Sequence, residues 1–126
     1  MNTRSVRTAL TAVSLTLAAG EVLASVVIWR EAYPDSAPLV VLAFAVPFLL
    51  AAGLARSGRV VAGAVITGLL CVFQLVEYPG LVRHNAFDWA FQSAFAAISL
   101  TGLGIAAAAL IAGRRSPTSR TGVVGR

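Results

Sequence analysis

Glu21 is the residue whose type and position most strongly indicate chemistry, because it interrupts a run of the chain that carries no other charge. That run extends from Thr8 to Trp29 and lies between Arg7 and Arg30. As a helix it is long enough to cross the roughly 30 Å hydrocarbon layer of a bilayer. An ionised carboxylate at that depth costs several kcal/mol unless it is paired, hydrated or protonated. We therefore expect Glu21 to bind a proton or a ligand. The alternative is a protonated carboxyl that only fixes helix packing.

A second group of polar and aromatic residues begins near the end of the third apolar run. Gln74 lies inside that run, and its amide can donate a hydrogen bond to Glu21 at a comparable depth. The residues that follow are Glu77, Tyr78, Arg83, His84, Asp88, Trp89 and Gln92. Together with Glu21 and Gln74 they form the predicted ligand-binding or proton-binding site. For the two glutamines the alternative role is hydrogen bonding between helices. For Arg83 the alternatives are an anionic head group and a charge pair with Glu77 or Asp88, and for His84 a solvated loop position.

Small and polar residues recur every three or four positions in three of the apolar runs, which places them on one face of each helix. The three stripes are Thr11, Ser14, Ala18, Glu21 and Ser25; Ala64, Thr67, Cys71, Gln74 and Tyr78; and Asp88, Gln92, Ala96, Ser99, Gly102 and Ala106. We expect each stripe to face protein or a water-filled cavity, with Leu15, Val22 and Val26 turned elsewhere. Small residues at this spacing let membrane helices approach closely.

The inventory of reactive residues excludes several classes of site. The chain has one histidine and one cysteine, so it cannot build a bis-histidine haem, a multi-histidine metal site or a disulfide. It also lacks a Ser-His-Asp arrangement and a phosphate-binding glycine loop. We expect no catalytic residue, metal or cofactor, and an enzyme is disfavoured. Acid–base chemistry by Glu21, Glu77 and Asp88 on a lipophilic substrate is the alternative.

The elements that must position these residues are four apolar runs. Apolar residues make up 58% of the 126-residue chain and charged residues 12%, which is outside the range of water-soluble domains. We predict an all-α membrane protein with four transmembrane helices, at about 8–29, 38–55, 60–78 and 87–112, packed as a small antiparallel bundle. Residues 1–113 form this domain, and 114–126 form a disordered, basic cytoplasmic tail. A cleaved secretory signal is the alternative for the first run, which its length and Glu21 disfavour.

The arginines are distributed unequally between the two ends of the predicted helices. The larger group comprises Arg4, Arg7, Arg56, Arg59, Arg114, Arg115, Arg120 and Arg126, against Arg30 and Arg83 at the opposite end. The excess of positive charge predicts that both termini are cytoplasmic, in a multi-pass protein of the inner or plasma membrane. Trp29, Tyr33, Tyr78 and Trp89 mark the opposite, outer boundary. Because the arginines border apolar runs, the net charge of +5 indicates anionic lipid rather than nucleic acid.

The segment Ala19-Gly20-Glu21-Val22 resembles the first helix of the small multidrug resistance transporters. In that family the glutamate is shared between protons and cationic drugs, so the resemblance implies the same role for Glu21 in a dimeric transporter. The likeness covers only a short part of the chain. The third apolar run contains only Phe73 where the family has several aromatic residues, and Gly102-x-Gly104 does not reproduce the family's glycine spacing. No residue other than Glu21 is carried over.

These observations lead to one functional hypothesis and two alternatives. We expect a non-enzymatic membrane protein that binds a lipophilic small molecule, a lipid or a partner membrane subunit through its outer polar cluster. The first alternative is a dimeric proton-coupled transporter that uses Glu21. The second is an accessory subunit whose stripes face a larger membrane complex. Beyond the lipid bilayer, the expected partners are thus further copies of the chain or a larger complex, and not nucleic acid.

Overall fold

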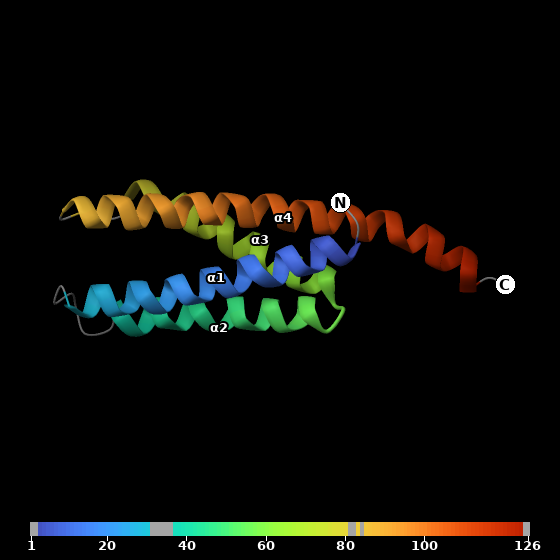
Figure 1. Ribbon diagram of the computed structural model, residues 1–126, viewed down its shortest axis with the longest axis horizontal. Helices are drawn as coiled ribbons and strands as arrows, with labels where there is room; N and C mark the ends of the chain where they lie inside the picture. Colours follow the sequence, from blue (N-terminus) through green and yellow to red (C-terminus); the bar gives the residue numbers. More distant parts are fainter. Residues whose placement is uncertain (1–2, 31–36, 81–82, 84, 125–126) are drawn as a thin grey trace.

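The computed structural model describes residues 3–30, 37–80, 83 and 85–124, without the side chains of 3, 27–30, 37, 38 and 114–124. In this part of the chain the regular secondary structure is entirely helical (Figure 1). Helix α1 spans Thr3–Arg30, α2 spans Ala37–Arg56, α3 spans Val60–Glu77 and α4 spans Ala86–Val124. A short 3-10 helix, η1, covers Tyr78–Gly80.

All four α-helices are long and apolar enough to cross a membrane. The qualifying segments are Arg4–Val26, Leu39–Arg56, Val60–Gly80 and Ala86–Gly113. For the described residues, the prediction of an all-helical fold is therefore confirmed, as is that of four helices long and apolar enough to span a membrane. Helix α4 continues through Val124, beyond its apolar segment and into the region expected to be disordered. The disorder of that tail and the cytoplasmic placement of the termini stay predictions.

Local sequence explains where two of the helices begin and end. Gly58 follows α2 with a φ of 100°, a left-handed conformation that glycine adopts at low cost, and the chain turns there into α3. At the start of α4 the backbone N–H of Asp88 donates to Asn85 Oδ1 at 2.9 Å, so Asn85 caps the helix.

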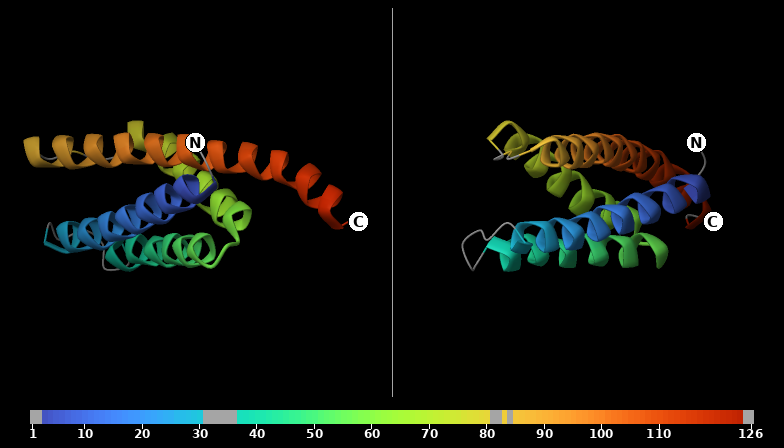
Figure 2. Two further views of the ribbon diagram at one scale, coloured as in Figure 1. Left: turned by 45° about the vertical axis from the view of Figure 1, so that its right-hand side comes forward. Right: turned by 60° about the vertical axis from the view of Figure 1, so that its left-hand side comes forward.

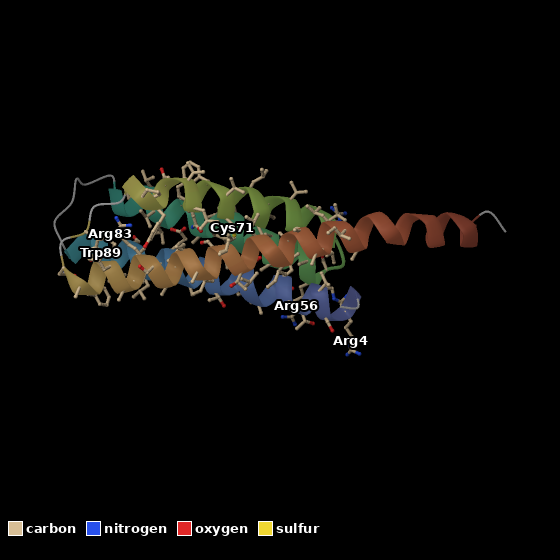
Figure 3. The ribbon with its side chains drawn as sticks, turned by 90° about the horizontal axis from the view of Figure 1, so that it is seen from above. Arg4, Arg56, Cys71, Arg83 and Trp89 are labelled. Carbon is tan, nitrogen blue, oxygen red and sulfur yellow. The ribbon has the colours of Figure 1, made fainter. Side chains whose placement is uncertain are left out.

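The helices form two hairpins, α1–α2 and α3–α4, which are joined by contacts of α2 with α3 and of α1 with α4. Helix α3 begins beside α2 and ends beside α4 (Figure 1). Arg83 and Trp89 lie at one end of the molecule, and Arg4 and Arg56 lie toward the other (Figure 3). We call these the Trp89 end and the Arg56 end. The two hairpins diverge toward the Trp89 end (Figures 1 and 2).

The apolar core lies at the middle of the helices and toward the Arg56 end. Its buried members are Val6, Leu10, Val13, Leu17, Ala18, Ala45, Phe48, Ala55, Ala64, Cys71, Ala106 and Ala109. Glycine permits the closest approaches. A Cβ on Gly63 would lie 2.8 Å from the backbone oxygen of Ala51, and one on Gly102 would lie 3.0 Å from Cys71 Sγ and 3.3 Å from Leu17 Cδ1. Gly102 therefore lies where α1, α3 and α4 pack closely together.

Candidate functional site

A hydrogen-bonded chain of three side chains connects α1, α3 and α4. Gln74 Nε2 donates to Glu21 Oε1, and Ser99 Oγ donates to Gln74 Oε1 at 2.7 Å. Both polar atoms of the Gln74 amide are thus engaged, one by each neighbouring helix. Because an amide nitrogen only donates and an amide oxygen only accepts, the two bonds together fix the orientation of the amide.

This connection is buried. Glu21 is 6% exposed and Ser99 is fully buried, while Gln74 is half-buried between them. The predicted pairing of Glu21 with Gln74 is confirmed. Ser99 was placed on the inward stripe of the fourth run but not among the site residues. Ser99 lies seven residues after Gln92 on the same stripe, and this spacing could have identified it as a site residue.

A second buried hydrogen bond lies two helical turns deeper. Ser14 Oγ and Thr67 Oγ1 are 2.8 Å apart, and their separation along the chain is 53 residues, the same as that of Glu21 and Gln74. Each partner of the deeper bond precedes its counterpart by seven residues. A constant offset with a heptad spacing means that α1 and α3 run parallel and meet along one seam. The same register places Ser25 at the level of Tyr78.

Burial confirms the inward direction predicted for the three stripes. The stripe positions are buried or half-buried, from Thr11 to Ser25 on α1, Ala64 to Tyr78 on and just after α3, and Asp88 to Ala106 on α4. Leu15, Val22 and Val26, which were expected to turn elsewhere, are all exposed. The stripes therefore form the contact surfaces between helices, and the exposed apolar side chains form the outside.

Toward the Trp89 end, the residues buried between the helices change from apolar to polar. The described side chains toward this end are those after Ala18 on α1 and after Cys71 on α3, and those before Ala45 on α2 and before Ser99 on α4. Among them only Glu21, Ser25 and Asp88 are buried, and no apolar side chain is. We call this region the polar seam: Glu21, Ser25, Gln74, Tyr78, Asp88, Ser93 and Ser99.

The outermost level of the seam is built around Tyr78. Its hydroxyl lies 3.0 Å from Ser93 Oγ, which joins η1 to α4 farther outward than the Gln74–Ser99 bond. Its backbone oxygen accepts a 2.8 Å hydrogen bond from Arg83 Nη2. The Arg83 guanidinium carbon lies 4.7 Å from the centre of the Tyr78 ring and 4.3 Å from that of Trp89. Figure 3 shows Arg83 and Trp89 side by side at this end.

The remaining predicted site residues occupy different surroundings. Glu77 is exposed, whereas Asp88 is buried in the first turn of α4 and Gln92 is half-buried one turn further along. His84 lies outside the described residues, as do Tyr33 and the side chain of Trp29. Among the residues that the structure describes, no three histidine, cysteine or acidic side chains are grouped closely enough to hold a metal ion.

An aromatic ladder borders the seam and was missed at the sequence level. Phe87, Phe91 and Phe95 lie one turn apart on α4, with ring centres separated by 6.0 and 6.1 Å. The innermost ring, Phe95, covers Gly20, where a Cβ would collide with it. Aromatic residues spaced by four are neighbours on a helix surface, so this spacing could have revealed the ladder. It leads along α4 from the Trp89 end to the residue beside Glu21.

The arrangement combines three chemical properties. A carboxyl group able to carry a proton or pair with a cation is held by an amide donor, hydroxyl groups can donate or accept, and phenyl rings supply an apolar wall. This combination suits recognition of an amphipathic molecule. A scan against protein-family models and searches of curated proteins and of solved structures each found no match to this chain.

Proposed function

We propose that this chain is a multi-pass membrane protein that binds an amphipathic molecule, a lipid or a lipophilic small molecule, in the polar seam. The molecule would enter from the bilayer between the two hairpins, with its polar groups against Glu21, Gln74 and Ser99. The arginine distribution supports an inner or plasma membrane location with both termini in the cytoplasm. In that orientation the seam lies at the depth of the outer leaflet.

The observation that carries this proposal is the change in the kind of residue that is buried. Apolar packing holds the helices together through the middle and the Arg56 end. Among the described side chains toward the Trp89 end, only polar ones are buried, and apolar ones such as Phe95 and Ile98 are half-buried. Burying polar groups in an apolar medium costs free energy unless they are hydrogen-bonded, and ionisable groups inside a membrane typically mark functional sites. A purely structural contact between these hairpins would be more stable with an apolar seam.

The divergence of the hairpins and the aromatic ladder support the same proposal. The helices separate toward the Trp89 end, where the polar seam lies (Figures 1 and 2). Phe87 is 56% exposed, so the ladder begins at the molecular surface and ends at Phe95 over Gly20. An acyl or alkyl chain packed along these rings would place a polar group beside Glu21.

Native mass spectrometry of the chain purified in a mild detergent tests this proposal. The unaltered protein should retain a bound amphiphile, and Gln74→Leu should lose most of it because the amide that organises the seam is removed. The control is Thr67→Val, which removes the deeper Ser14–Thr67 bond but leaves the seam intact. Equal retention by both variants would refute the proposal, and a copurifying polypeptide in place of an amphiphile would assign the seam to a partner subunit.

Proton-coupled transport of a small molecule is the second candidate, and the Glu21–Gln74 bond favours it. The Gln74 amide can donate to Glu21 whether that carboxyl is protonated or ionised, so the carboxyl can exchange a proton without losing its partner. Glu21→Gln should then abolish pH-driven uptake into proteoliposomes while the variant keeps the parent's helical circular dichroism. Uptake by Glu21→Gln equal to that of the parent would exclude this candidate.

A further inference from the structure

Two aromatic rings at the Trp89 end hold a positive charge between them. Arg83 follows η1 along the chain, Tyr78 begins η1, and Trp89 lies in the first turn of α4. The guanidinium carbon is within 5 Å of both ring centres, at 4.7 Å from Tyr78 and 4.3 Å from Trp89. The charge of Arg83 is thus shared by two ring faces that come from different elements.

Aromatic faces attract cations because the ring quadrupole is negative above and below its plane. Two or more rings arranged around one charge are the arrangement by which proteins recognise quaternary ammonium groups, which lack N–H donors and cannot use ordinary hydrogen bonds. Here the charge belongs to the chain itself. Its position is held by the 2.8 Å hydrogen bond from Arg83 Nη2 to the backbone oxygen of Tyr78.

We propose that Tyr78 and Trp89 form a head-group site for an amphiphile with a quaternary ammonium group, and that Arg83 is a tethered cation that competes with it. This inference rests on the proposed function, because it names the head group of the molecule that the polar seam would hold. On binding, the ligand's ammonium group would take the place of the guanidinium between the rings. Arg83 would move out toward water or lipid phosphate.

The position of the two rings supports this assignment. Tyr78 is one helical turn outward of Gln74, and its hydroxyl meets Ser93, so the head-group site continues directly into the polar seam. Trp89 is 56% exposed, which leaves its ring accessible from outside. The exposed Glu77 and the buried Asp88 lie in the same part of the chain and favour a cationic rather than an anionic head group.

Trp89 fluorescence provides the test. The full chain with Trp29→Phe retains Trp89 as its single tryptophan. It is placed in nanodiscs of phosphatidylethanolamine and phosphatidylglycerol, which contain no quaternary ammonium, and titrated with decyltrimethylammonium. Arg83→Gln should bind the probe about ten-fold more tightly than the parent, equivalent to about 1.4 kcal/mol. Adding Tyr78→Leu to Arg83→Gln should remove that gain.

Two further variants protect the test from a folding artefact. Arg83→Met keeps a long side chain without the charge and should show the same gain as Arg83→Gln. Arg83→Lys keeps a tethered cation and should bind the probe no more tightly than the parent. Equal affinity of the parent and both neutral variants would overturn the proposal. The proposal would also be overturned if the parent binds decyl phosphate and the neutral variants do not, because Arg83 would then be an anion-binding group.

Changing the probe separates the head-group site from the seam. If decyltrimethylammonium and the short tetramethylammonium bind with equal affinity, and Arg83→Gln raises both affinities, the head-group site is supported and binding of the amphiphile in the polar seam is contradicted. If decanol binds as well as decyltrimethylammonium, depends on Gln74 and ignores Arg83, the seam is supported and the head-group site is overturned.

Discussion

Replacing Gln74 by leucine should destabilise the packing of three helices at once. The variant removes the hydrogen bond to Glu21 and the 2.7 Å bond from Ser99, while leucine still fills most of the volume of the amide. Hydrogen bonds between membrane helices average about 0.6 kcal/mol and reach about 1.7 kcal/mol. The two bonds together therefore predict a loss of about 1 to 3 kcal/mol of unfolding free energy.

The groups left behind determine where in that range the loss falls. Ser99 can turn its hydroxyl to a carbonyl of its own helix one turn earlier, so its loss is small. Glu21, which is 6% exposed, keeps a buried carboxyl without its amide donor. Leaving such a group without its partner costs more than the bond itself contributes. Most of the loss should therefore come from Glu21.

Reversible unfolding in mixed micelles, with increasing dodecyl sulfate and circular dichroism as the readout, measures this loss. Thr67→Val removes one interhelical bond and should cost about a third to a half as much. Val76→Ala, at a position on α3 that is 74% exposed, should change little. In the double variant Glu21→Leu/Gln74→Leu, the cost should be smaller than the sum of the single costs. A stability of Gln74→Leu equal to that of the parent would refute this account of the network.

Three further predictions follow from packing. A valine side chain at Gly102 would overlap Cys71 and Leu17, so Gly102→Val should lower the unfolding free energy by about 1 to 3 kcal/mol in the same assay. Gly104 faces open space, so Gly104→Val should cost far less. Equal costs for the two variants would contradict the packing at Gly102. Gly20→Ala should destabilise the protein because the Phe95 ring covers Gly20, and Phe95→Leu should reduce the cost of that substitution. If Gly20→Ala costs as much in the Phe95→Leu background, the ring is not the cause of the destabilisation. Cys71 is fully buried, so a maleimide reagent should label it only after unfolding in dodecyl sulfate, and rapid labelling of the folded chain would place the thiol elsewhere.

Periodicity and composition were sufficient to predict the helices and the faces they bury. The apolar runs located four spans, because a bilayer requires about 20 consecutive apolar residues. The stripes of small and polar residues located the inward faces because spacings of three and four return to the same side of a helix. Depth along the spans was enough to pair Glu21 with Gln74, since residues on facing helices at equal depth can meet.

The features that sequence reasoning missed depend on how helices are placed relative to one another. The joint engagement of Gln74 by Glu21 and Ser99 required the register between α3 and α4, which the connection after η1 determines. The position of Phe95 over Gly20 required the contact of α1 with α4. For Arg83 the sequence predicted an anionic head group or a charge pair, whereas the structure also places its guanidinium over the ring faces of Tyr78 and Trp89.

The central claim is that an amphipathic molecule occupies the polar seam, and photo-crosslinking tests it most directly. The chain in nanodiscs is irradiated with an alkyl amphiphile that carries a diazirine near its polar group, and the labelled peptides are sequenced. The account predicts labels on residues 19–26 of α1 and 91–99 of α4, reduced in Gln74→Leu and preserved in Thr67→Val. Labels spread evenly over lipid-facing positions such as Val46 and Leu50, with no response to Gln74→Leu, would contradict it.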